Sequence, residues 1–334
     1  MVRNDFGITE IVMVGDRGMI TNPRVKELRA LEGMDWVTAL RAPAIAALAR
    51  DDGPLQMSLF DVQNFAEITH PDYPGERLVC CKNPALAEER SRKREELLTT
   101  TEQELDKIVR AVSAGRLSGE DAIGIRVGKV INRRKVGKHF IITITGTSFT
   151  YRRDEEKICA ESSLDGIYVI RTSLTADRLD TVATISAYKN LANVERDFRS
   201  IKTGDLDLRP IYHYLSDRVR AHVLTCMLAS YLTWHMRERL APLTFTDERV
   251  PIRQDPVLPA WRSTEAKAKD ARKKTGDGVA LSSYHDLLKH LETLTRQQVS
   301  FAEQQFERIS EPTDVHRRVF ELIGSPIPLT LAPA

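Results

Sequence analysis

One carboxylate stands midway between an aromatic hydroxyl and a lysine in the carboxyl-terminal half of the chain. Tyr188, Glu195 and Lys202 follow one another at intervals of seven residues. At 100° per residue, a helix brings these side chains within about 40° of one another over roughly 21 Å. Arg199 falls on the same side. Such a face favours metal and phosphate chemistry, because a carboxylate can hold a cation and the flanking donors can hold phosphate oxygens.

The same pattern is also typical of the solvated side of an ordinary helix. An apolar stripe runs beside it, formed by Ala187, Leu191, Val194, Phe198 and Ile201. The polar residues therefore border the buried edge. In this interpretation Glu195 and Arg199 are an i,i+4 ion pair worth about a few tenths of a kcal/mol. The helical pattern alone leaves both interpretations open.

A second carboxylate, Asp16, favours the metal-binding interpretation. It ends an apolar, β-branched run that begins at Ile8, and a helix-like segment and a second strand-like run (Asp35 to Arg41) follow. This order predicts a β-α-β unit with parallel strands. Asp16 would then stand at the carboxyl end of a strand, where α/β sheets bind ligands. Two carboxylates from different elements are part of what a pair of Mg²⁺ ions needs for phosphodiester chemistry.

A long helix is predicted between these two carboxylates. Charges of alternating sign from Pro84 to Val112 indicate about eight helical turns. Its basic cluster consists of Arg90, Arg92, Lys93 and Arg94. The helix is expected either to be solvated or to contact phosphates through this cluster.

The sequence from Gly124 to Leu174 predicts a β-rich block, because apolar and polar residues alternate and suggest a hairpin and a further strand. A second basic stretch lies within it, at Arg133, Arg134, Lys135 and Lys138. A phosphate contact and a solvated surface are both open for this stretch.

The remaining chain is predicted to be mainly helical. Helices are expected over 175–203, with Ser173 or Thr175 as the N-cap, over 217–240 and over 282–306, with a linker over 251–278. The most apolar helical run, 221–234, is shorter than the roughly 20 residues of a membrane span and contains a His, so we predict a buried core helix and no membrane partner.

The composition is that of a soluble protein. The 334 residues are 42% hydrophobic and 29% charged, which suffices for one large core or two modest ones. A net charge of +2 means that any basic surface must be local. The four cysteines form no C-x-x-C pair and have no His at metal-ligand spacing, so we expect reduced thiols. No signal-peptide pattern opens the sequence, and we therefore expect a cytoplasmic location.

The sequence around the two carboxylates resembles that of the DDE transposases of bacterial insertion sequences. The spacing of Tyr188, Glu195 and Lys202 is similar to their Y-x2-R-x3-E-x6-K signature, and VMVGDRGMIT resembles the strand that carries their second aspartate. Other segments, such as DGIYVIRTSL, extend the resemblance over most of the chain. It implies an α/β fold with a ribonuclease H-like catalytic core, interrupted by a β-rich insertion and followed by a helical carboxyl-terminal part.

By this resemblance, Asp16 matches the second metal-binding Asp and Glu195 the metal-binding Glu. Tyr188 and Lys202 match positions that contact transposon-end DNA, and Arg199 would assist them in gripping the backbone. The implied cofactor is Mg²⁺, with Mn²⁺ as a substitute. The implied partners are double-stranded DNA at transposon ends and a second copy of the chain in a synaptic homodimer.

The sequence departs from the family pattern in two places. Leu191 stands where the signature has Arg, which puts one phosphate contact in doubt. The family's first catalytic Asp lies on an earlier strand, and the fifteen residues before Asp16 cannot hold the elements between them. We therefore expect the chain to begin inside the catalytic domain and to lack one of three carboxylates. An alternative takes Asp16 as the first Asp and Asp165 as the second, although Asp165 is better explained as a turn residue.

Two functional hypotheses follow from the resemblance. The first is a transposase fragment that hydrolyses phosphodiester bonds and transfers strands at transposon ends, with little or no activity alone. The second is a catalytically inactive DNA-binding or dimerisation remnant that interferes with an intact transposase. The expected parts are a partial ribonuclease H-like core (1–56), an insertion region (57–174), core helices with the catalytic Glu (175–250), and a linker with a carboxyl-terminal helix (251–334).

Overall fold

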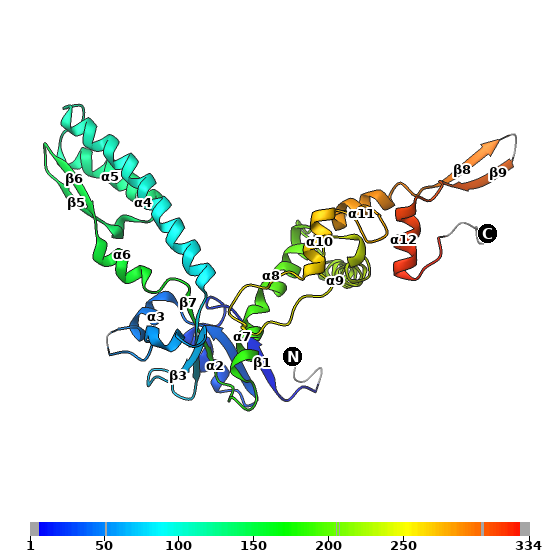
Figure 1. Cartoon of the computed structure of the whole chain (residues 1–334), viewed down its shortest axis with the longest axis horizontal. Coiled ribbons are helices and arrows are strands. Elements are labelled where there is room, and N and C mark those ends of the chain that lie inside the picture. The colour runs from blue at the N-terminus through cyan, green and yellow to red at the C-terminus, as the bar shows by residue number, and fades with distance from the viewer. Residues whose placement is uncertain (1–6, 51, 205, 207, 302–303, 328–334) are drawn as a thin grey trace. The chain divides into compact units, whose positions relative to one another are not determined.

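The computed structural model describes residues 7–50, 52–204, 206, 208–301 and 304–327 (Figure 1). The chain divides into two compact units. Unit 1 comprises residues 1–191 and 255–259, and unit 2 comprises residues 192–254 and 260–334.

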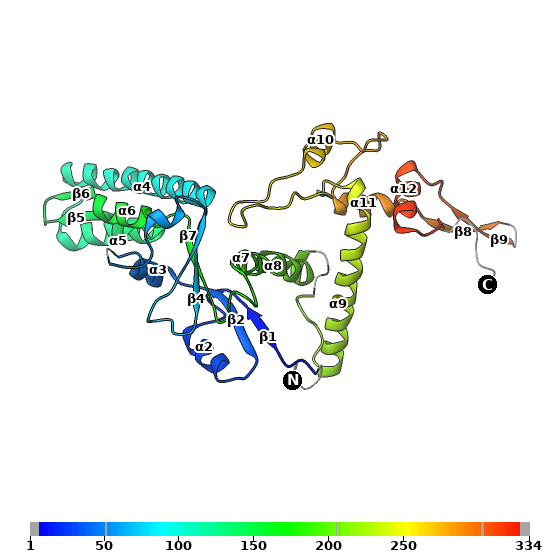
Figure 2. The same ribbon diagram turned by 60° about the horizontal axis from the view of Figure 1, so that its bottom comes forward.

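Unit 1 is built on a five-stranded mixed sheet in the order β1-β2-β7-β4-β3. The strands are β1 (Ile11–Val14), β2 (Met34–Ala39), β3 (Phe65–Ile68), β4 (Arg77–Lys82) and β7 (Ile167–Thr172). β1 and β2 run parallel and are connected by α2 (Asn22–Arg29), which confirms the predicted β-α-β unit. β7 is antiparallel to both β2 and β4. The last strand of this sheet in sequence order therefore lies at its centre (Figure 2).

The central strands of this sheet bury side chains on both faces, and successive side chains of a strand point to opposite sides. Along β4, Leu78 and Cys80 pack in one core cluster, whereas Val79 and Cys81 pack in another. The first cluster includes side chains of α3 (Ala42–Leu48), and the second includes Ile185 of α7 (Thr181–Lys189). The sheet is therefore the layer against which α7 is held.

A buried ion pair lies at the side of the sheet. The Glu76 side chain is 1% exposed and accepts hydrogen bonds from Arg171 Nε (2.5 Å) and Nη2 (2.6 Å). Arg29 Nη2 donates a third at 2.9 Å. Because a buried charge without a partner is costly, these three side chains specify how α2 packs beside β7.

Residues 84–162 form an extension of unit 1 that we call the arm. It contains α4 (Pro84–Ser113), α5 (Glu120–Arg134), the hairpin β5–β6 (Phe140–Ile144 and Phe149–Arg153) and α6 (Glu155–Ser162). The arm has its own apolar core, in which Leu98 and Leu105 of α4 meet Ile123 of α5 and Phe149 of β6. Figure 1 shows α4 and α5 side by side. The long helix and the hairpin are confirmed.

The expectation of a β-rich block from Gly124 was wrong for the segment that forms α5. Its apolar residues Ile123 and Val127 are four apart and lie on one buried face. Acidic residues in the first turn and basic residues in the last turn complement the helix dipole. Packing against α4 decides for helix, although valine and isoleucine favour strands in isolation.

The predicted helix over 175–203 is shorter and interrupted. α7 begins at Thr181, because the side chain of Asp180, rather than Ser173 or Thr175, caps it by accepting the Ala183 N–H at 2.7 Å. It ends at Lys189, and α8 (Leu191–Arg199) follows after Asn190, with a π-helical turn over Ser200–Gly204. Tyr188 and Glu195 therefore lie on different helices.

Unit 2 contains α9 (Ser216–Arg239), α10 (Thr264–Arg272), α11 (Tyr284–Leu291), the hairpin β8–β9 (Arg296–Phe301 and Gln304–Ile309) and α12 (Asp314–Ile323). The prediction of a buried core helix was wrong for α9. Within the described residues only Cys226 of this helix is buried, and Leu224, for example, is 57% exposed. The reason is that the core of unit 2 lies beyond the end of α9, at Leu240, Leu243, Leu287 and Val319.

The expected linker over 251–278 has more structure than predicted. Residues 255–259 belong to unit 1, where Val257 is fully buried in the core beside Ile185. α10 occupies much of the remainder. The helix expected over 282–306 ends at Leu291, and the β8–β9 hairpin follows it in the sequence. None of the described helices combines the length and apolarity that a membrane crossing requires.

Candidate active site

Asp16 lies in a tight turn two residues after β1, at the carboxyl end of the strand as predicted. Its Oδ1 accepts the backbone N–H groups of Gly18 (2.9 Å) and Met19 (2.7 Å). The turn requires Gly15, because a Cβ there would lie 2.9 Å from the Ile20 side chain. The carboxylate is exposed and held by one oxygen, and among the described residues its Oδ2 has no hydrogen-bond donor.

Tyr188 lies close to Asp16 within unit 1. It is half-buried at the end of α7 and packs against the core that holds Ile185. Burial raises the pKa of the Tyr188 phenol, the nearby Asp16 carboxylate adds to this increase, and the positive charge of Arg17 opposes it. The structure thus brings together two predicted site residues that are far apart in the sequence.

Arg17 lies near Asp16 and Tyr188, and the sequence did not single it out. It follows Asp16 directly, its side chain is exposed, and among the described residues it forms no ion pair. Its position next to a carboxylate at a strand end was the available signal. A free guanidinium beside Asp16 and Tyr188 is suited to hold a phosphate oxygen.

Glu195 lies on α8 in unit 2, and its side chain is 73% exposed. Arg199 Nη2 donates a hydrogen bond to Glu195 Oε1 at 2.8 Å, and this is the i,i+4 pair that the spacing predicted. Lys202 follows in the π-helical turn, with its Nζ 5.7 Å from the centre of the Phe198 ring. These three polar side chains are accessible to solvent and lie within two helical turns of one another.

The five predicted residues divide between the two units. Asp16 and Tyr188 belong to unit 1, and Glu195, Arg199 and Lys202 belong to unit 2. The pairing of Asp16 with Glu195 stays a prediction, because the two residues belong to different units.

Carboxylate oxygens are the ligands that Mg²⁺ prefers. Within the described ranges, no group of three or more His, Cys, Asp or Glu side chains could hold a metal ion. Asp16 has a free Oδ2, and Glu195 has its Oε2 free of the Arg199 bond. Each residue by itself therefore offers the right type of oxygen donor but not a complete set of metal ligands.

Asp165, the alternative second aspartate, has a structural partner. It lies in the turn before β7, where Arg94 Nη1 donates to its Oδ1 at 3.2 Å and Arg94 Nη2 binds its Oδ2. The Asp165 side chain is 11% exposed. The ion pair with Arg94 accounts for an acidic residue at position 165, and no role in metal binding is needed to explain it.

The two basic clusters noted in the sequence are largely neutralised. On α4, Arg92 pairs with Glu96, Lys93 with Glu89 and Arg94 with Asp165. In the second stretch, Arg134 binds both oxygens of Glu104 at 2.9 Å, and Lys138 pairs with Glu161. The solvated interpretation therefore fits Arg92 and Lys93, whereas Arg94 forms a nearly buried structural ion pair.

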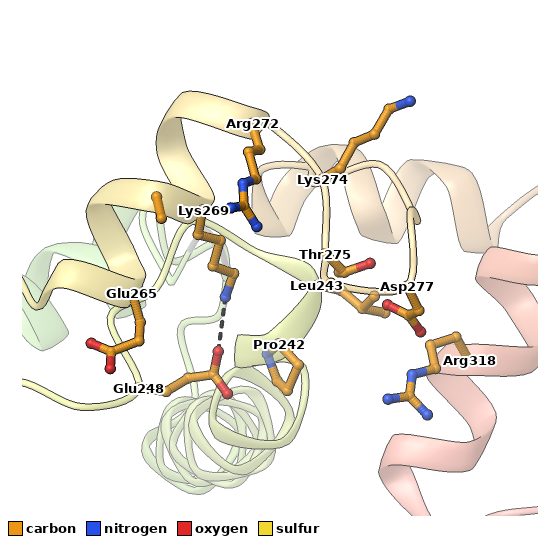
Figure 3. Close-up of a pocket in the computed structure, with 12 residues that line it drawn as sticks. Pro242, Leu243, Glu248, Glu265, Lys269, Arg272, Lys274, Thr275, Asp277 and Arg318 are labelled. Atoms are coloured by element: carbon orange, nitrogen blue, oxygen red, sulfur yellow. Dashed lines mark hydrogen bonds and ion pairs between the residues drawn. The ribbon is translucent and has the colours of Figure 1, made fainter.

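Two cavities lie away from the predicted residues. One, of about 410 Å³, is bordered in unit 2 by Lys269, Arg272 and Arg318 (Figure 3). Its cations are offset by acidic neighbours, as where Lys269 Nζ donates to Glu248 Oε1 at 2.9 Å. The other, of about 740 Å³, lies between α3 and residues 69–73 of unit 1. Neither contains any of the five predicted side chains.

Comparisons with known proteins give one match. A family model described as "Transposase DDE domain" matches residues 2–232, which is more than half of the chain. All five predicted site residues and Arg17 fall inside the matched span. No curated protein and no solved structure matches the chain.

Proposed function

The chain belongs to the transposase DDE domain family, and we propose that it cleaves phosphodiester bonds at transposon ends and transfers the freed strands to target DNA. The observation that carries the proposal is the span of the family match, which includes both Asp16 and Glu195. Its proposed partners are duplex DNA and, in the synaptic complex, a second copy of the chain.

Within this proposal, β1, α2 and β2 are part of a ribonuclease H-like core. The parallel β-α-β unit with Asp16 at a strand end supports this. Residues 175–250 would add the core helices that carry Glu195, and the arm would belong to the insertion between them. The observed mixed sheet, with antiparallel β7 next to β2, is compatible with an insertion whose strands extend the core sheet.

Asp16 and Glu195 are the proposed metal ligands. DDE transposase domains are generally dependent on a divalent metal ion, and we propose Mg²⁺, with Mn²⁺ as a substitute. Bound there, the ion would supply Lewis-acid activation of the attacking hydroxyl and the leaving oxygen. Asp16 is suited to this role because the amides of Gly18 and Met19 fix its carboxylate while leaving Oδ2 open.

The cationic side chains would hold the DNA backbone. Arg199 now binds Glu195, and if the Glu195 oxygens turned to a cation, the Arg199 guanidinium would be released for a phosphate. Lys202, at the end of the same helical segment, would supply a second positive charge. Arg17 would do the same beside Asp16.

Tyr188 would act as a neutral hydrogen-bond donor. Burial raises the pKa of its phenol above the usual value of 10.0, so the hydroxyl keeps its proton at neutral pH. A protonated hydroxyl next to Asp16 can donate to a phosphate oxygen without adding negative charge. Tyr188 would therefore position the backbone near the proposed metal ligand.

The test is a cleavage assay with the purified chain, produced from Met1 and also with any in-frame segment that the gene encodes upstream of Met1. The substrate is a labelled duplex that carries a terminal inverted repeat from the flanking DNA. We expect nicks at the repeat boundary with Mg²⁺ or Mn²⁺ and none with a chelator. If both forms bound the duplex and neither nicked it, the catalytic proposal would be overturned in favour of a noncatalytic DNA-binding protein.

A further inference from the structure

The middle of the arm carries a long stretch of sequence without acidic residues. Between Asp121 and Asp154 there is no Asp or Glu, whereas eight Lys and Arg residues occur. The net charge of the whole chain conceals this imbalance. The question is which of these eight positive charges the folded protein leaves without a counter-charge.

Three of the eight are neutralised by acidic residues from outside the stretch. Arg134 binds both carboxylate oxygens of Glu104 at 2.9 Å. Arg153 binds both Glu95 and Glu102, in each case through two hydrogen bonds of 2.8–2.9 Å. Lys138 pairs with Glu161. These pairs join α4 to α5 and to β6, and the turn before β5 to α6, so their charges serve the packing of the arm.

Arg126, Lys129 and Arg133 form a different group, which we call the α5 stripe. At 100° per residue the three lie within an arc of about 60° and span about 10 Å of α5. All three side chains are exposed. Among the described residues Arg126 and Lys129 have no ion-pair partner, and Arg133 lies 3.7 Å from Glu104, both oxygens of which already accept Arg134.

The α5 stripe differs from the solvated face of α4. On α4, exposed Arg92 and Lys93 each pair with a Glu one turn away. The α5 stripe has no acidic neighbour on its own helix after Asp121. The helix dipole favours a cation in the last turn and so explains Arg133, but Arg126 and Lys129 lie too far from the end of α5.

The opposite face of α5 holds the stripe rigidly. Ile123 and Val127 are 0% and 2% exposed and pack in the arm core with Leu105 of α4. A helix fixed in this way presents its exposed charges at set spacing, and little backbone entropy is lost when a ligand binds. One strand of duplex DNA carries a phosphate about every 3.4 Å along the axis, so three cations over about 10 Å match about three phosphates.

We propose that the α5 stripe binds the sugar-phosphate backbone of duplex DNA. This inference rests on the proposed function, because it adds a contact surface for the same DNA partner. It concerns a part of the chain remote in sequence from both Asp16 and Glu195. The contact is sequence-independent, since phosphates position a protein on DNA and do not identify bases.

The test compares two variants of the full chain that lose the same charge. Arg126→Gln/Lys129→Gln removes two cations of the stripe, and Arg92→Gln/Lys93→Gln removes two paired cations from α4. Binding to a fluorescent duplex of mixed sequence is measured by anisotropy over a range of salt concentrations. For the stripe variant we expect affinity to fall roughly 10- to 60-fold, and the slope of log K against log salt to decrease in magnitude by about 1.8. The α4 variant should bind like the wild type.

Each other outcome counts against the inference. Equal binding by the wild type and the stripe variant would overturn it and leave DNA binding by the chain intact. Equal losses in both variants would show a general charge effect and would also overturn it. Failure of the wild type to bind the duplex would remove the proposed function as well. If polyglutamate bound as tightly as the duplex and was lost in the same variant, an acidic protein would replace DNA as the partner. Thermal melting of both variants serves as the control that they fold.

Discussion

Arg94 and Asp165 form an ion pair that fastens the long helix of the arm to the turn before β7. The two side chains are 10% and 11% exposed, and Arg94 reaches both oxygens of Asp165. The residues are 71 positions apart. An aspartate that could have been a catalytic ligand by its position in the sequence is therefore engaged at the base of the arm.

Asp165→Asn should reduce stability and spare catalysis. Breaking this buried ion pair leaves Arg94 with the more distant Glu161, 4.0 Å away, and we expect the free energy of unfolding to fall by about 3 kcal/mol. Urea denaturation measures this loss. Metal-dependent nicking, assayed below the unfolding transition, should persist. Asp72→Asn is the control, because the Asp72 side chain is 80% exposed and its removal should leave stability unchanged. Loss of nicking with unchanged stability would restore Asp165 as a metal ligand.

Asp16→Asn and Asp16→Ala should separate the chemical role of Asp16 from its structural role. The Asn side chain can still accept the amides of Gly18 and Met19 and keep the turn, so its stability should remain close to that of the wild type. Its nicking activity should be lost because an amide is a poor ligand for Mg²⁺. Asp16→Ala should lose activity and also about 1 kcal/mol of stability, the usual net contribution of a side-chain hydrogen bond. Full activity of Asp16→Asn would contradict the assignment.

Glu195→Gln should abolish nicking in any form of the chain that nicks DNA. Removing a metal ligand costs several kcal/mol in the transition state, so we expect a rate decrease of at least about 100-fold. Glu96→Gln is a matched control, since Glu96 is also exposed and paired with an Arg one turn away on a helix. Both substitutions should change stability by less than about 0.5 kcal/mol. Activity that survives Glu195→Gln would remove this residue from the site.

Stability should decrease in acid through Glu104. Two hydrogen bonds from Arg134 lower the pKa of the Glu104 carboxyl below its ordinary value of 4.5. A carboxyl with a lowered pKa in the folded state stabilises the protein above pH 4.5, and this contribution is lost as the pH falls through the lower folded value. Melting temperatures measured across this range should fall less steeply for Glu104→Gln than for the wild type. Glu88→Gln, at an exposed position of the same helix, should follow the wild type.

The sequence alone determined the features that depend on local pattern. The run ending at Asp16 predicted a strand, a helix and a parallel strand, and the structure has all three. The sequence also predicted the thirty-residue helix α4 and the β5–β6 hairpin, because alternation and helical periodicity are properties of neighbouring residues. The spacing of Tyr188, Glu195 and Lys202, with Asp16, also sufficed to indicate the family that the match to residues 2–232 shows.

The tertiary structure decided what depends on distant partners. Valine and isoleucine in α5 favour a strand locally, and only packing on α4 makes them helical. Basic clusters in the sequence did not reveal that Arg94 and Arg134 are neutralised by Asp165 and Glu104, because ion pairs join segments that a local pattern cannot compare. For the same reason the free cations of the arm could be identified only after every pair had been assigned. Folding, and not the sequence alone, decides which cations keep a counter-charge.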